Sequence, residues 1–453
     1  MSATAAPTQS LSSYSEHVNP RWEDLLNLLG MNVRYERCLG TELFTDDGRR
    51  ILDFLSGYCV HNTGHNHPAI VQALKDELDR CGPAMLQTDV PELAGELARR
   101  LCRLAGGGLN KAYFGSSGSE GVETAIKFCR AATGRTGLLY CAGGFHGLTC
   151  GALSLMSDPF WRAGFGPMIE GAEHVPFGDL EALERKLATG RFAGFVTESI
   201  QGESGILLPP KEYLASAESV CKRYGTVFVL DEVQTGMFRT GPFLAAHEYG
   251  ARPDMVILAK ALSGGLVPSG AVLMTDEIYE AVYSSIERAF IHTSTYSENG
   301  LAMRAGLATL DVLESECLGQ RAKATGIELR RRLSEALSRF EMVKEVRGAG
   351  LFCGIEFAAP RGLGMRVSFE AFRKIHPAMF GQCVVMRMFR DRGILTQICG
   401  NNFMVLKAAP PLTVSDAQVD EFVTGVRDTV EFVHSSGGFW SEALHLVRRG
   451  IKI

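Results

Sequence analysis

The chain has 453 residues, of which 46% are hydrophobic and 21% charged, a composition typical of a globular protein with at least one large core. Its net charge of −5 and isoelectric point near 6.2 offer no basic surface for nucleic acid or a membrane, so small molecules are the expected partners. Twelve cysteines are scattered without a CxxC pair or zinc-like spacing, which predicts reduced thiols, a cytoplasmic location and no metal site. No apolar run reaches the roughly 18 residues of a membrane span.

Short apolar runs alternate with amphipathic segments through the middle of the chain. The strand-like runs, each bounded by Gly, Pro or charge, lie at 135–141, 192–199, 225–232, 254–260 and 269–275. Amphipathic helices are predicted between some of them, at 180–190 and 211–225. Near-continuous apolar strands alternating with helices predict a mainly parallel sheet covered on both faces, in a large α/β domain at 60–315.

The remaining segments predict a smaller α+β domain at 316–453. It begins with a helix around 326–340, and residues 345–357 then alternate like one half-buried strand. Further strand-like sequence at 393–406 precedes an amphipathic helix at 416–433. The connection at 361–383 is long and is expected to shape the entrance of the site. Residues 1–59 are expected to form a loose N-terminal arm, without signal-peptide features, and a segment of the small domain.

In open α/β sheets the ligand lies at the carboxyl ends of the strands, where two glycine-rich segments of this chain fall. The first is GSSGSEGVETAIKFCR at 115–130, where a helix starts directly after a short strand. Its free N–H groups, with the Ser117 and Ser119 hydroxyls, can hold an anion, although a plain capped helix is the alternative. The second places Phe145 between glycines, able to lie against a planar ligand; a core aromatic is the alternative.

Two charged residues end buried strands. Asp231 and Glu232 follow VFVL, and a carboxylate there loses much of its hydration unless a cation or hydrogen-bond donors compensate. Lys260 follows MVILA, where partial desolvation lowers a lysine pKa and makes it a usable nucleophile and base; a lysine extending to solvent is the alternative.

These four features match what a protein needs to bind pyridoxal 5'-phosphate (PLP): an anion cradle, a stacking aromatic, a buried carboxylate and a desolvated lysine. The lysine bonds to the cofactor aldehyde, and Asp231 keeps the pyridine nitrogen protonated. The negative charge of Asp231 and the positive charge of the protonated ring nitrogen then compensate each other, which explains a carboxylate at a position shielded from water.

Several motifs make the sequence resemble the class III, or ω-, aminotransferases of fold type I over about residues 32–433. They are GHNHP, the FHG triplet, TESIQGESG, LDEVQTGMFRTG with its following lysine, HTSTY and APPLT. The family contains ornithine, acetylornithine, 4-aminobutyrate and putrescine aminotransferases. EHVNP, VPFGDLEAL and LDEVQTGMFRTG are most similar to the putrescine branch.

The resemblance implies a role for each matching residue. Lys260 matches the lysine that bonds to PLP and moves protons, Asp231 the partner of the ring nitrogen, and Glu198 an active-site glutamate. The other cofactor positions implied are Ser117, Gly118 and Ser119 at the phosphate, Phe145 and Val233 on the ring faces, Gln234 near the ring hydroxyl, and His146 in a structural role. Thr295 matches a threonine that reaches the phosphate of the neighbouring subunit, which implies a homodimer with shared active sites.

The substrate side departs from the family pattern. Relatives carry an arginine before APPL that recognises a carboxylate and pairs with a glutamate, here Glu203. This chain has Lys407, which cannot make the same bidentate fork. Leu148 stands where some relatives carry a second arginine, and Tyr58 should line the entrance. Residues 297–300 read Ser-Glu-Asn-Gly in place of Gly-Gly-Asn-Pro and put Glu298 near the subunit boundary.

These departures favour a transaminase that exchanges an amino group between a primary amine, including diamines and amines with an apolar tail, and a keto acid or aldehyde. A racemase or epimerase of the same fold would use the same lysine and cofactor but return the proton to the substrate carbon. A binding or regulatory protein that has lost catalysis is the alternative of another class, and the intact Asp231 and Lys260 argue against it.

Overall fold

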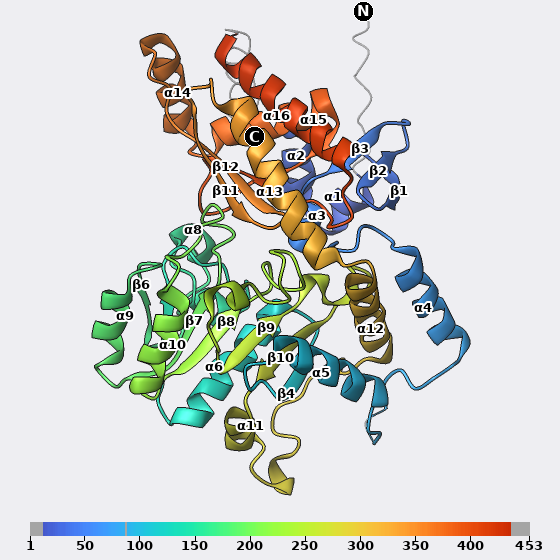
Figure 1. Ribbon diagram of the computed structural model, residues 1–453, viewed down its shortest axis with the longest axis vertical. Coiled ribbons are helices and arrows are strands. Elements are labelled where there is room, and N and C mark those ends of the chain that lie inside the picture. Colours follow the sequence, from blue (N-terminus) through green and yellow to red (C-terminus); the bar gives the residue numbers. More distant parts are fainter. Residues whose placement is uncertain (1–11, 87, 436–453) are drawn as a thin grey trace, which may run out of the picture.

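The computed structural model describes residues 12–86 and 88–435, drawn as the coloured ribbon in Figure 1. The first part of the expected N-terminal arm and the end of the C-terminal segment lie outside these residues. No helix in the two described ranges is long and apolar enough to cross a membrane.

A seven-stranded sheet forms the centre of the lower lobe in Figure 1. Its strands, in spatial order, are β4 (Lys111–Gly115), β10 (Gly270–Met274), β9 (Met255–Leu258), β8 (Val227–Asp231), β7 (Phe192–Glu198), β5 (Gly137–Cys141) and β6 (Ala172–Val175). β10 runs antiparallel to both neighbours, and the other neighbouring pairs are parallel. The mainly parallel sheet expected from the apolar runs is therefore confirmed.

Helices cover both faces of this sheet because successive strand residues point to opposite sides. In β8, Val227 and Val229 pack with α6 (Gly118–Thr133), whereas Phe228 and Leu230 pack with α10 (Tyr213–Arg223). The other helices and 3₁₀ turns of this lobe are α5 (Glu92–Ala105), α7 (Cys150–Ser154), α8 (Pro159–Arg162), α9 (Leu180–Leu187), α11 (Asp276–Val282), η1 (Ala245–Tyr249), η2 (Lys260–Ser263) and η3 (Ile286–Arg288).

The upper lobe in Figure 1 contains two small sheets. One is antiparallel, in the order β11 (Val343–Ala349), β12 (Phe352–Phe357), β15 (Val405–Ala408) and β14 (Gln397–Ile398). The other joins β1 (Tyr35–Leu39), β2 (Glu42–Thr45) and β3 (Arg50–Asp53) to β13 (Ile394–Leu395). β3 and β13 are parallel neighbours, so the N-terminal segment shares a sheet with the C-terminal part.

The helices of the upper lobe and of the connection between the lobes complete the fold. They are α1 (Ser13–His17), α2 (Pro20–Leu29), α3 (Ser56–Cys59), α4 (Pro68–Asp79), α12 (Gly300–Ser315), α13 (Leu318–Leu337), α14 (Leu363–Ile375), α15 (Met379–Arg392) and α16 (Asp416–Ser435). The helix expected around 326–340 therefore starts eight residues earlier, at Leu318.

The prediction of one strand over 345–357 is wrong, because the segment is a tight hairpin of β11 and β12. The turn depends on Gly350, which has φ +51° and lies so close to Thr240 that a Cβ atom would be 2.6 Å from backbone. The alternation of apolar residues continues across the turn, so the pattern by itself could not reveal it.

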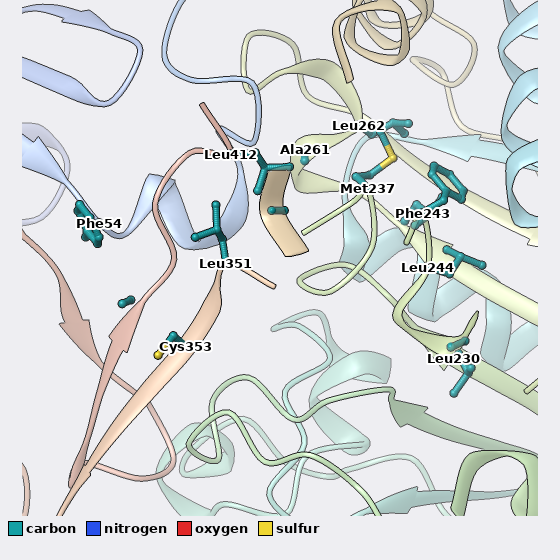
Figure 2. Close-up of a cluster of buried hydrophobic side chains, with 14 of the residues drawn as sticks. Phe54, Leu230, Met237, Phe243, Leu244, Ala261, Leu262, Leu351, Cys353 and Leu412 are labelled. Atoms are coloured by element: carbon teal, nitrogen blue, oxygen red, sulfur yellow. The ribbon is translucent and has the colours of Figure 1, made fainter. Parts of the chain in front are cut away.

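A continuous core joins the two lobes. Figure 2 shows Phe54, Leu351, Cys353 and Leu412 of the upper lobe on one side of the joint and Met237, Phe243 and Leu262 of the large lobe on the other. Arg239 lies fully buried at the same joint and donates hydrogen bonds to the carbonyls of Leu351 and Pro410 and to the side chain of Asn62. The lobes are therefore fixed relative to each other beside the ends of the large-sheet strands.

Candidate active site

A cavity of about 490 Å³ opens at the carboxyl ends of β7, β8 and β9. It brings together most of the residues predicted from sequence: Ser117, Gly118, Ser119, Phe145, His146, Glu198, Asp231, Val233, Gln234 and Lys260. They come from five separate segments of the chain, and the strand order of the large sheet places those segments side by side.

The start of α6 forms one wall of the cavity. Ser117 is the N-cap, and its hydroxyl accepts a hydrogen bond from the Glu120 N–H at 3.2 Å. Gly118 and Ser119 follow, and both line the cavity. A Cβ atom at Gly118 would be 3.0 Å from the Val233 side chain, so a larger residue here would have to displace Val233. Free N–H groups and the positive helix end give the wall an affinity for phosphate.

Asp231 is buried at the end of β8 and is held by two hydrogen bonds. One oxygen accepts from the Val233 N–H at 3.0 Å, and the other from His146 Nδ1 at 2.8 Å. Burial lowers the pKa of His146, but the hydrogen bond and the negative charge of Asp231 outweigh burial and raise it overall. His146 therefore orients the Asp231 carboxylate through this hydrogen bond, and the structural role expected for His146 stays a prediction.

Lys260 follows β9 and begins η2 with φ +46°, a backbone conformation rare for a residue with a side chain. Burial lowers its pKa, although the charge of Asp231 opposes this effect. A lowered pKa increases the fraction of neutral amine available to attack an aldehyde. The interpretation of Lys260 as a reactive cavity lysine, rather than one extending to solvent, thus agrees with its position.

Glu198 ends β7 and also lines the cavity. Its two oxygens accept hydrogen bonds from the N–H groups of Phe145 and Gly202, both at 3.0 Å. Burial raises its pKa to about 7. The carboxyl group therefore holds the backbone of Phe145, the residue expected to lie against the cofactor ring.

Glu232, the second carboxylate of the VFVLDE segment, serves the protein rather than a ligand. It accepts hydrogen bonds from the Ser199 and Thr235 hydroxyls and from the N–H groups of Ala245 and Ala246. The two backbone hydrogen bonds hold the start of η1 against Glu232. The buried Arg239, unlike Glu232, is not indicated by the sequence patterns, where only its place inside the GMFRTG segment marks it.

A buried ion pair lies beside the cavity. Lys407 on β15 has no exposed surface and is hydrogen-bonded to Glu203. Glu203 also accepts from Gln234 Nε2 at 3.1 Å and from the Gly400 N–H at 2.8 Å. Burial raises the pKa of Glu203, but the charge and hydrogen bond of Lys407 outweigh burial and lower it. Lys407 Nζ is 5.2 Å from the centre of the Tyr58 ring, so Tyr58 joins the same cluster.

Other predicted residues lie apart from the cavity. Leu148 is 55% exposed and does not line it. Thr295 and Glu298 line a separate groove. None of the described residues of 361–383 lines the cavity, and α14 lies at the outer end of the upper lobe, away from the large sheet in Figure 1. The expectation that this segment shapes the entrance is therefore wrong for the cavity of its own chain.

The donor set fits PLP. A helix N-terminus suits the phosphate, Asp231 suits a protonated ring nitrogen, and Lys260 suits the aldehyde. Phe145 and Val233 line the cavity and supply apolar contacts for the ring. The fold and the cavity thus define a PLP-dependent enzyme of fold type I.

Comparison with known proteins identifies the family. Residues 27–430 match the model of the class-III aminotransferases, and the chain belongs to this family. It is 34% identical to aminotransferase PigE of Serratia sp., over 92% of this chain and about half (53%) of that protein. It is 33% identical to putrescine aminotransferase of Pectobacterium atrosepticum, over 93% of this chain and 88% of the relative.

Solved structures agree with this assignment. An ornithine aminotransferase from Toxoplasma gondii superimposes with a TM-score of 0.80 at 26% identity, covering 94% of this chain and 99% of that one. The protein is a PLP-dependent aminotransferase. The comparisons give no support to the racemase or epimerase alternative.

Proposed function

We propose that this aminotransferase prefers, as amino donor, a primary amine without a carboxylate, including diamines, and passes the amino group to a keto acid or aldehyde. The buried Glu203–Lys407 pair is the observation that carries this proposal. The 33% identity to a putrescine aminotransferase gives independent support.

The pair leaves little positive charge for a substrate carboxylate. Glu203 neutralises Lys407, and Gln234 and the Gly400 N–H hold Glu203 in place. Lysine offers a compact charge without the planar fork with which arginine binds a carboxylate. Releasing Lys407 would leave Glu203 buried without its cation, which costs on the order of 3 kcal/mol. A donor without a carboxylate avoids that cost.

The other cavity residues divide the chemistry among them. Bound PLP supplies an aldehyde that bonds to amines and a protonated ring that accepts electron density. Lys260 would hold the cofactor at its aldehyde, and its amine is the base placed to move a proton at the substrate carbon. Asp231, oriented by His146, keeps the ring nitrogen protonated, and Ser117, Gly118 and Ser119 bind the phosphate.

We infer that the active unit is a homodimer. Thr295 lies on a groove of about 920 Å³, apart from the cavity of its own chain. The groove is lined by large apolar side chains that remain exposed in the single chain, among them Val90 at 86% and Ile286 at 90%. Exposed large apolar side chains gathered among polar ones in a groove are typical of a subunit interface. A second subunit on this groove would bring Thr295 toward its neighbour.

A cytoplasmic location is part of the proposal. All twelve cysteines are free thiols, which suits a reducing compartment.

The test is a donor panel. Purified enzyme with PLP is assayed with putrescine, butylamine, ornithine, 4-aminobutyrate and glutamate as donors, against pyruvate and 2-oxoglutarate. We expect kcat/KM to be highest for the donors without a carboxylate. A preference for glutamate over every simple amine would overturn the proposal.

A further inference from the structure

The helix α8 carries an aromatic cluster that contacts both Phe145 of the cofactor cavity and the loop at Gly400 and Asn401. The Trp161 ring meets the Phe145 ring edge-on, with centroids 5.4 Å apart and planes at 80°. Phe145 lines the cofactor cavity. Phe160 packs in the same way on the other side of Trp161, at 5.1 Å, and is 74% exposed. The three rings therefore form a continuous aromatic wall from the cavity to solvent.

Hydrogen bonds fix this wall to the loop that holds Glu203. Trp161 Nε1 donates to Asn401 Oδ1 at 3.0 Å, and Asn401 Nδ2 donates to the Gly143 carbonyl at 2.8 Å. The Asn401 N–H donates to the Glu203 carbonyl at 2.9 Å. A Cβ atom at Gly400 would lie 3.6 Å from the Trp161 ring, so the indole also packs against this loop. Trp161 consequently links Phe145, at the cavity, to the loop at Gly400 and Asn401 that contacts Glu203.

We propose that Trp161 is a specificity-determining residue whose indole, together with exposed Phe160, receives the apolar alkyl or aryl tail of the substrate. The inference deepens the proposed function and rests on it for the class of donor. An indole buries a large apolar area on contact with a tail, and its N–H already has a protein partner. The wall therefore offers a substrate tail apolar contact rather than a free hydrogen-bond donor.

The comparison of two donors with the same reacting end tests this role. Butylamine and 4-phenylbutylamine differ only in the phenyl group at the far end. With the full-length enzyme and PLP, we expect Trp161→Ala to lower kcat/KM for 4-phenylbutylamine about tenfold, with butylamine changing less than threefold. The loss should fall mainly on KM. Trp161→Phe keeps an apolar ring and should retain the preference for 4-phenylbutylamine over butylamine. This variant also tests the proposal if Trp161→Ala fails to fold.

Phe165→Ala is the matched control, because Phe165 is 67% exposed near α8. It should leave the ratio of the two donors unchanged. A second readout does not depend on which donor the enzyme prefers. It compares the inhibition constants of 4-phenylbutan-1-ol and butan-1-ol, measured with any donor that the enzyme accepts. We expect the inhibition constant of the phenyl alcohol alone to rise about tenfold in Trp161→Ala.

Two results would overturn the proposal. One is an equal loss for both amines and both alcohols, which would make Trp161 a general structural residue. The other is an unchanged ratio in Trp161→Ala. A parent enzyme that prefers carboxylate-bearing donors would instead overturn the proposed function, and the alcohol ratio would still decide the role of Trp161.

Discussion

At the residue scale, adjacent carboxylates of one strand end have different roles because their donors differ. Asp231 is held by one backbone N–H and by His146, and it faces the cavity. Glu232 is surrounded by hydroxyl and backbone donors of its own chain. Because the protein itself supplies the hydrogen-bond donors of Glu232, that carboxylate has a structural role. Asp231 has fewer protein donors and faces the cavity, so it is available to a cationic ring nitrogen.

Lys407→Arg should strengthen binding of 2-oxoglutarate. Arginine restores a planar fork at this position, so the apparent KM for the keto acid should fall about tenfold, equivalent to roughly 1.4 kcal/mol. Steady-state kinetics with butylamine as donor measure this change. Lys344→Arg, on an exposed lysine, is the control and should have no effect. An unchanged KM in Lys407→Arg would show that Lys407 does not contact the acceptor carboxylate.

Glu198 should make the stability of the enzyme without PLP fall between about pH 5 and pH 7.5. Its folded pKa is about 7, above the ordinary 4.5, so the folded state binds more protons than the unfolded state in this window. Stability present at low pH is therefore lost as pH rises toward the folded pKa. Relative to Glu198→Gln, the parent should lose about 2 kcal/mol of unfolding free energy across this range, measured by urea titration.

The control for this prediction is Glu170→Gln, which removes an exposed carboxyl group and should retain the pH dependence of the parent. Parallel pH profiles for the parent and Glu198→Gln would contradict the assignment.

At the element scale, the N-terminal end of α6 depends on close approaches that only glycine allows. Gly147 has φ +122°, and a Cβ atom there would be 2.1 Å from the Ser119 hydroxyl. Gly147→Ala should therefore displace Ser119 from the phosphate cradle and weaken PLP binding on the order of tenfold or more. Titration of the cofactor-free protein with PLP, followed by fluorescence, gives the dissociation constant.

Gly134→Ala is the matched control at the other end of α6. Gly134 also has positive φ, +68°, but no atom lies within 4 Å of the position that the new methyl group would take, so only backbone strain is added. Its PLP affinity should stay close to that of the parent. Equal losses in the two variants would show that strain, rather than contact with Ser119, controls binding.

At the scale of the whole molecule, a shared active site should reveal itself by complementation. In a mixed dimer of Lys260→Ala and Thr295→Ala chains, one site carries both changes and the other carries neither. After random subunit exchange the mixture should recover about a quarter of wild-type activity. The Lys260→Ala parent should be inactive and the Thr295→Ala parent weakened.

Exchange is followed with differently tagged chains, and a mixture of Lys260→Ala with a tagged Lys260→Ala chain is the control. Demonstrated exchange without recovered activity would mean that Thr295 serves the site of its own chain.

The sequence by itself determined the mainly parallel sheet, the approximate ends of β5, β7, β8, β9 and β10, and the chemistry placed there, but it did not indicate β6. Apolar runs such as 225–232 are typical of buried strands. A lysine or aspartate directly after such a run lies at the carboxyl end of the strand. It did not determine the β11–β12 turn, because alternation continued through Gly350. Nor did it indicate Arg239, whose partners on Asn62, Leu351 and Pro410 are far away in the chain.

Only the tertiary structure decided which side chains meet beside the cavity. No local pattern joins Trp161 to Asn401 or Lys407 to Tyr58, because the residues of each pair are far apart in the chain and meet only in the folded structure. The structure also separated Leu148 from the cavity and Thr295 onto another groove. Local sequence fixes periodicity and the chemistry at strand ends, whereas long-range packing fixes which of those groups share one enclosed space.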